Sequence, residues 1–93
     1  MKLTYDNEAD ALAIRIADGI VDRTVELEPG TLVDIDAAGS VLVIEVIQPA
    51  RRWPLDEVLQ RFQIQDADAA VLRGIQGGDD VLSLVEPAPL AVA

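Results

Sequence analysis

YDNEADALAIRI, residues 5–16, and VDIDAAGSVLVIEV, residues 33–46, decide the fold of this chain. Each stretch joins a polar break to a run in which aliphatic side chains alternate with other residues, a pattern that is typical of a half-buried β-strand. In the second stretch the strands span residues 32–36 and 41–47, and DAAGS between them is a turn. Aspartate favours the start of such a turn, and glycine supplies its positive φ. The sequence therefore predicts hairpins of an antiparallel sheet.

The same reasoning extends to the rest of the chain. Alternating residues predict further strands at 1–5 and 21–27 and a final one at 81–85. Apolar residues at helical spacing predict a helix over 54–62, where Pro54 occupies a favoured first-turn position. A second short helix is predicted over 66–75, with an apolar face formed by Ala67, Ala70, Val71 and Gly74.

These elements predict an α+β fold: a small antiparallel β-meander of about five strands followed by one or two short helices. The 93 residues suffice for one compact unit with a thin margin of stability. We divide it into a β-meander at residues 1–50 and a helical or irregular C-terminal extension at residues 51–93. The extension is expected to pack on the sheet or on a second subunit.

The strand VLVIEVI, residues 41–47, is apolar on both sides. An antiparallel strand with one face in water should alternate, yet strict alternation places Val41, Val43 and Ile47 opposite the first apolar face. Burying each such side chain is worth about 1.5–3 kcal/mol. We therefore expect a homodimer, or a helix laid over that face. Interface candidates are the aliphatic residues of that face and the two nearby aromatic residues, Val41, Val43, Ile47, Trp53 and Phe62.

Charge and composition exclude several functions. The formal net charge is −10, from 7 Lys and Arg against 17 Asp and Glu, and the longest basic run is Arg51-Arg52. Nucleic acid and anionic membranes are therefore not expected partners, whereas a basic protein is. The chain holds no cysteine and no histidine, and it starts without the apolar segment of a secretory signal. We expect a cytoplasmic protein that is not an enzyme.

Carboxylates supply the remaining candidates for chemistry. Asp34, Asp36 and Gly39 resemble the start of a calcium loop, and Glu45 stands at the twelfth position. The alternative is an ordinary hairpin turn, because the flanking residues are strands. Asp34 and Glu45 could also form an acid/base pair, or pair with an arginine. We expect no catalytic residue and no cofactor, and name Asp34, Asp36 and Glu45 only as weak candidates for a metal site.

Several motifs together resemble a known family. They are YDNEADALAIR at 5–15, TVEL at 24–27, VDIDAAG at 33–39 and IEV at 44–46. This order resembles the domain-of-unknown-function family 2283 (DUF2283) over about residues 2–50. The chain departs from the family pattern at Val43, where glycine is usual, and at Ala13, where an aromatic residue is frequent.

The resemblance implies a β-meander with a following helix and no established catalytic activity. It also implies an association with small toxin-like proteins, for which some members are suspected antitoxins. The expected function is a small protein-interaction module, an antitoxin-like acidic partner of a toxin-like protein. Two alternatives are a small-molecule or divalent-metal-binding protein that uses the Asp and Glu residues, and a structural homo-oligomer without ligand.

Overall fold

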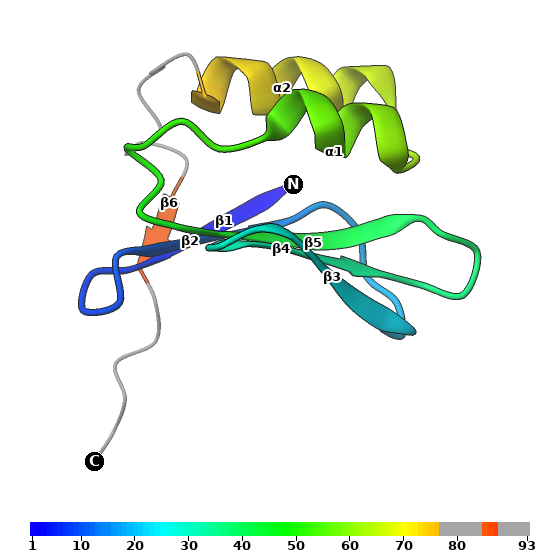
Figure 1. Ribbon diagram of the computed structural model, residues 1–93, viewed down its shortest axis with the longest axis horizontal. Helices are drawn as coiled ribbons and strands as arrows, with labels where there is room; N and C mark the ends of the chain where they lie inside the picture. The colour runs from blue at the N-terminus through cyan, green and yellow to red at the C-terminus, as the bar shows by residue number, and fades with distance from the viewer. Residues whose placement is uncertain (77–84, 88–93) are drawn as a thin grey trace.

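The structure, a computed structural model, describes residues 1–76 and the backbone of residues 85–87. It is a six-stranded sheet with two helices over one face (Figure 1). The α+β class is confirmed: five antiparallel strands are followed by two helices. In chain order the elements are β1 (Lys2–Asp6), β2 (Ala11–Arg15), β3 (Arg23–Glu28), β4 (Thr31–Ile35), β5 (Val41–Ile47), α1 (Leu55–Arg61), α2 (Asp66–Gln76) and β6 (Val85–Pro87).

The strand order, β3-β4-β5-β2-β1-β6, interrupts the expected meander at one connection. The hairpin β1–β2 and the meander β3-β4-β5 form as expected, but β2 pairs with β5 instead of with β3. Burial explains this order, because it places the most apolar strand, β5, in the interior of the sheet. The edge position falls to β3, whose charged side chains Arg23, Glu26 and Glu28 tolerate exposure and discourage edge-to-edge association.

The core lies between the sheet and the helices. One row of register partners crosses four strands through Leu3, Ile14, Ile44 and Val33, and all four side chains are buried. Helix residues complete the same cluster, namely Leu55, Val58 and Leu72. Side chains of this row point toward the helices, so their neighbours along each strand point to the opposite side of the sheet. We call that opposite side the outer face.

Val41 does not lie where strict alternation placed it. The pairing of β4 with β5 shifts register, so that Ile35 pairs with Val41 while Asp34 pairs with Val43. Leu42 is thereby the extra residue of a β-bulge, which reverses the side-chain direction. Val41 is buried in the core with Ile35, and its predicted place beside Val43 and Ile47 was wrong. The outer face is correspondingly less apolar than the sequence indicates.

Both helices form at the predicted places, but the buried face of α2 differs from the prediction. Leu72 is fully buried, whereas Val71 is 41% exposed, and Ala67 and Ala70 also face solvent. Ile75, three residues after Leu72 and on the same side of the helix, packs against the same core cluster. The larger side chains, rather than the row of small ones, therefore determine which way α2 faces.

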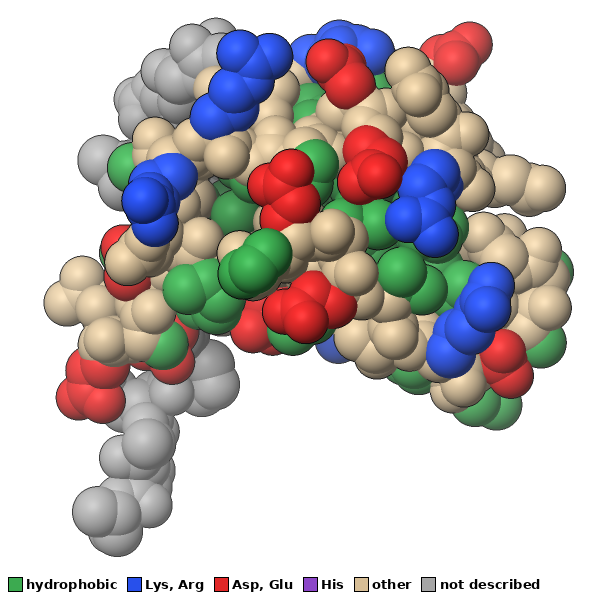
Figure 2. Space-filling view, in the orientation of Figure 1, with side chains coloured by type: hydrophobic (Ala, Val, Ile, Leu, Met, Phe, Trp, Pro, Cys, Tyr) green, Lys and Arg blue, Asp and Glu red, His purple; other side chains and the backbone are tan. Residues whose placement is uncertain are grey.

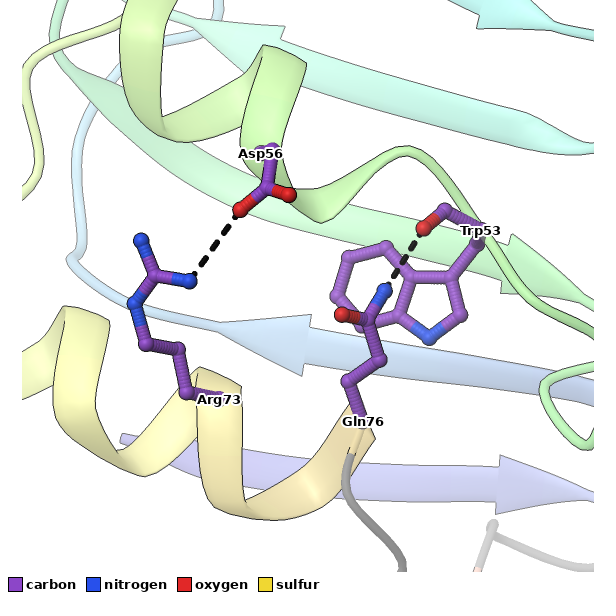
Figure 3. Close-up of polar contacts among 4 residues, drawn as sticks. All are labelled: Trp53, Asp56, Arg73 and Gln76. Atoms are coloured by element: carbon purple, nitrogen blue, oxygen red, sulfur yellow. Dashed lines mark hydrogen bonds and ion pairs between the residues drawn. The ribbon is translucent and has the colours of Figure 1, made fainter.

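Polar contacts join the end of α2 to α1 and to the segment before it (Figure 3). The Gln76 amide donates a hydrogen bond to the Trp53 carbonyl oxygen at 2.6 Å, and Arg73 Nη1 lies 3.1 Å from Asp56 Oδ1. Trp53 itself is only 5% exposed and belongs to the core cluster. Residues 51–76 thus pack on the sheet of their own chain. Of the expected last strand, residues 81–84 lie outside the described residues, while β6 runs parallel to β1.

Candidate functional site

The residues whose spacing resembles a calcium loop, Asp34, Asp36 and Gly39, form part of a β-hairpin. Asp36 Oδ1 accepts hydrogen bonds from the amides of Ala38 at 3.0 Å and Ser40 at 2.9 Å, and Gly39 has a φ of +85°. One carboxylate oxygen is thereby committed to the turn backbone. In the described part of the chain, no three His, Cys, Asp or Glu side chains are placed to hold a metal ion. Divalent-metal binding stays a prediction that calorimetric titration would test.

Asp34 and Glu45 share the outer face without forming a pair in the register. Asp34 lies across from Val43, and Glu45 lies across from Leu32, so the two acids are diagonal neighbours on adjacent strands. The hydroxyl of Thr24 donates a hydrogen bond to Asp34 Oδ1 at 2.5 Å. Glu45 is flanked by Ala13 on β2 and by Leu32 on β4. The arrangement supplies two separate carboxylates on a partly apolar surface.

The acidic turn between β1 and β2 is also organised by hydrogen bonds. Asp6 Oδ1 accepts from the amides of Glu8 at 3.0 Å and Ala9 at 3.2 Å. Asp10 adopts a φ of +49°, and its Oδ1 accepts the hydroxyl proton of Tyr5 at 2.5 Å. This hydrogen bond raises the pKa of Tyr5 above its usual value, since the phenolate would lose the bond and face a carboxylate.

The pH titration of Tyr5 tests this geometry. Tyr5 is the single tyrosine, so its ultraviolet absorbance reports one group. We expect its pKa to lie above 10.0 and to fall in Asp10→Asn, which removes the charge but tolerates the positive φ. Because the pKa is higher in the folded state, this group leaves stability unchanged below pH 10.0 and lowers it as the pH rises further. An identical titration in both proteins would refute the hydrogen bond.

The outer face is the first candidate interaction surface. No described element covers it, because both helices lie on the other side of the sheet (Figure 1). Its centre is Glu45, which the register surrounds with four aliphatic side chains, Ala13, Leu32, Val43 and Ile47. Ile47, at 38% exposure, is the most open of the four. Lys2 and Arg15 lie toward β1 and β2, Glu26 and Asp34 lie toward β3 and β4, and Asp6 adds a carboxylate at the end of β1.

The second candidate is a groove where the β4–β5 hairpin meets the α1–α2 connection, at the right of Figure 1. Its volume is about 740 Å³. Aliphatic and aromatic side chains line its interior, Ile16, Val41, Leu42, Phe62 and Ile64, and three carboxylates stand among its lining residues, Asp18, Asp36 and Asp68. We call it the acid-rimmed groove. In Figure 2, hydrophobic side chains lie between the helical layer and the sheet, with charged side chains around them.

A loop extends apolar surface beyond this groove. Gly19 lies against Leu42, to which a Cβ on the glycine would come within 3.1 Å. The next residue, Ile20, is 88% exposed. Contiguous exposed apolar surface in a small protein is characteristic of an interaction site.

The five predicted interface residues are distributed over three places. Val43 and Ile47 lie on the outer face, Val41 and Phe62 line the acid-rimmed groove, and Trp53 lies in the core. The sequence reasoning missed Ile16, Leu42 and Ile64 as groove residues. Ile16 and Leu42 belong to alternating strand patterns, which predict core positions, and Ile64 lies between the two predicted helices, where no pattern indicated a role. The exposed Ile20 beside a turn was the one local signal of apolar surface at this end.

A further groove of about 610 Å³ adjoins Trp53, and Arg51 and Arg52 line it. Arg51 Nη1 donates a hydrogen bond to Gln48 Oε1 at 2.8 Å, which holds the basic pair against the end of β5. Glu28 lines the same groove, so its charge is mixed. This arrangement favours neither a cation nor an anion as the ligand.

Comparison with known proteins gives one match. The profile of DUF2283, described as a protein of unknown function, matches residues 2–48. No curated protein and no solved structure matches the chain. Within the described residues, neither helix has the length and apolar character needed to span a bilayer.

Proposed function

The chain belongs to the DUF2283 family of proteins of unknown function, and from its surfaces we propose that it is a protein-interaction module that binds a basic protein partner in the acid-rimmed groove. The observation that carries this proposal is the conjunction of apolar lining and carboxylates in one groove. A segment that presents aliphatic side chains flanked by lysine or arginine complements both.

The lining supplies the apolar part of the interaction. Leu42 and Val41 are buried at the bottom of the groove, whereas Phe62, Ile64 and Ile16 are only partly buried and can lose further exposed area on binding. Burial of apolar area is worth about 25 cal/mol per Å². Phe62 is the aromatic residue of this set, and aromatic side chains are enriched among the residues that dominate binding energy.

The charges of the groove favour a basic partner over other proteins and increase its rate of association. Asp18 lies on the rim with 96% of its side chain exposed, and its ion pair with Arg15 is long, at 3.7 Å. Such an exposed pair contributes little and exchanges readily. Asp68, near the start of α2, and Asp36, at the hairpin turn, add two further carboxylates. With a net charge of −10, the whole chain also attracts a basic partner over distance.

The proposal identifies the partner by chemistry, as a basic protein, and the family resemblance suggests a toxin-like protein encoded beside this chain. The protein would then act as the antitoxin-like, acidic member of the pair. The proposal includes the cytoplasm as the location, which fractionation of the producing cells tests.

Co-expression with the product of the adjacent reading frame tests this function. We expect a complex that survives purification at moderate salt and weakens as salt rises, because screening reduces attraction between exposed charges. The variant Asp18→Lys/Asp68→Lys should lose the complex. A matched control, Glu8→Lys/Glu57→Lys, makes the same change of charge at exposed positions outside the groove and should retain it. The absence of a complex, or equal loss in both variants, contradicts the proposal.

A further inference from the structure

A second surface, the outer face, carries an inference that is independent of the groove. We infer that the outer face is the interface between two copies of this chain, with Arg15 of each copy against Glu45 and Asp34 of the other. The inference rests on how charges and aliphatic side chains are distributed across the sheet.

Two adjacent rows of register partners define the pattern. One row, from β1 to β3, reads Lys2, Arg15, Val43, Asp34 and Thr24, and the next reads Thr4, Ala13, Glu45, Leu32 and Glu26. Within these two rows, positive charge is confined to β1 and β2, and negative charge to β5, β4 and β3; in the row beyond them, Asp6 adds a carboxylate at the end of β1. The aliphatic side chains surround Glu45 near the boundary of the two halves, with Val43 between Arg15 and Asp34.

This division is self-complementary. A two-fold axis parallel to the strands exchanges the two halves when one sheet is laid face to face on another. With the axis near β2 and β5, β2 of each copy lies over β5 and β4 of the other. Arg15 then meets Glu45 and Asp34, and Ala13, Leu32 and Val43 meet aliphatic counterparts. Sheets packed in this way keep their strands nearly aligned and about 10 Å apart.

The alternative occupants fit this face less well. A basic partner would complement the acidic half but would oppose Arg15 and Lys2, and an acidic partner would do the reverse. The helices of the same chain already cover the opposite face, so they cannot reach this one. A second copy is the occupant that matches both halves at once.

The area of the face sets the strength of the dimer. Five strands about 4.8 Å apart, each contributing about five residues of about 3.3 Å, give a projected area of about 400 Å². Side-chain relief raises the accessible area, yet it stays below the roughly 800 Å² per partner of a standard interface. We therefore expect a reversible dimer whose population rises with concentration.

Charge-reversal variants of the full chain test the inference by sedimentation equilibrium. Arg15→Glu makes positions 15, 34 and 45 of each copy acidic, and Glu45→Arg makes positions 15 and 45 of each copy basic. Each variant alone should dimerise at least about tenfold more weakly than the wild type, because like charges then face each other twice. Mixing the two variants should restore dimerisation to within about tenfold of the wild type, since both pairs between positions 15 and 45 are then opposite in sign, although position 15 of one copy still faces an acidic Asp34.

Matched variants control for net charge. Arg73→Glu and Glu57→Arg make the same changes on exposed helical positions, at 60% and 46% side-chain exposure, away from the outer face. Each should dimerise as the wild type does. If Glu45→Arg fails to fold by circular dichroism, Glu45→Gln takes its place, and its mixture with Arg15→Glu should dimerise better than Arg15→Glu alone.

Three results would overturn the inference: a wild-type chain that stays monomeric up to millimolar concentration, single variants that dimerise normally, or a mixture that fails to recover. A monomeric wild type that still binds the adjacent gene product would reject this interface and leave the proposed function standing. A wild type that dimerises as predicted but does not bind the adjacent gene product would reject the proposed function and leave this interface standing.

Discussion

Replacing Ile44 by alanine is expected to lower the free energy of unfolding by about 2–5 kcal/mol. Ile44 is fully buried in the interior strand β5, between Ile14 of β2 and Val33 of β4. Truncation removes buried methyl groups and leaves a cavity that a sheet paired on both sides cannot close. A small domain has only about 5–15 kcal/mol of stability in total, so the loss is a large share.

Chemical denaturation followed by circular dichroism measures this loss. The control is Val71→Ala on α2, which truncates an aliphatic side chain that is 41% exposed. Surface changes of this kind usually stay within about 0.5 kcal/mol. If both variants lost stability equally, Ile44 could not occupy the centre of the core.

The second large effect is expected for Trp53→Ala, with a loss of about 3–5 kcal/mol. Trp53 is the single tryptophan, and its ring is buried with residues of both the sheet and the helices. Its carbonyl oxygen accepts hydrogen bonds from the Leu55 amide at 2.8 Å and from Gln76. The backbone bonds can persist in the variant, so the loss reports the missing ring.

Trp53→Phe is the matched variant, because it keeps an aromatic ring and leaves a smaller cavity. We expect it to lose clearly less stability than Trp53→Ala in the same denaturation experiment. Tryptophan fluorescence of the wild type gives an independent check, since a buried indole should emit at shorter wavelength than the unfolded chain. A tryptophan that lay at an outer interface would produce neither result.

Local signals were sufficient for most of the fold. Alternation located β1 to β5, the proline and helical spacing located α1, and the helical spacing of small and apolar residues located α2. These signals act within one element, so they require no knowledge of partners. The neighbour of β2 could not be obtained in this way, because pairing with β5 or with β3 depends on how much apolar surface each arrangement buries.

The bulge at Leu42 shows a second limit. Alternation counts residues, and one extra residue on β5 reverses every assignment on one side of it. Val41 was therefore predicted to lie at an interface, whereas the structure places it in the core. On α2, the row of small residues suggested the wrong buried face, since Leu72 gains more from burial than alanine does.

The sequence indicated that the chain has an apolar surface outside its core, but it did not indicate where the acid-rimmed groove lies. The strand VLVIEVI indicated a second apolar face, and Val43 and Ile47 do lie on the outer face. The acid-rimmed groove combines residues from three separate parts of the chain, 16–18, 36–42 and 62–68, and each part alone has an ordinary explanation. Their meeting follows from the docking of α1 and α2, which the sequence pattern does not specify.

The central claim is that the acid-rimmed groove recognises a basic, aliphatic segment. Its most direct test is an amide chemical-shift titration of the full chain with a synthetic peptide of alternating leucine and lysine residues. The account predicts saturable, salt-sensitive shifts confined to residues 16–18, 36–42 and 62–68, and none with a peptide of leucine and glutamate. Shifts spread evenly over the acidic surface, or no shifts at all, would contradict it.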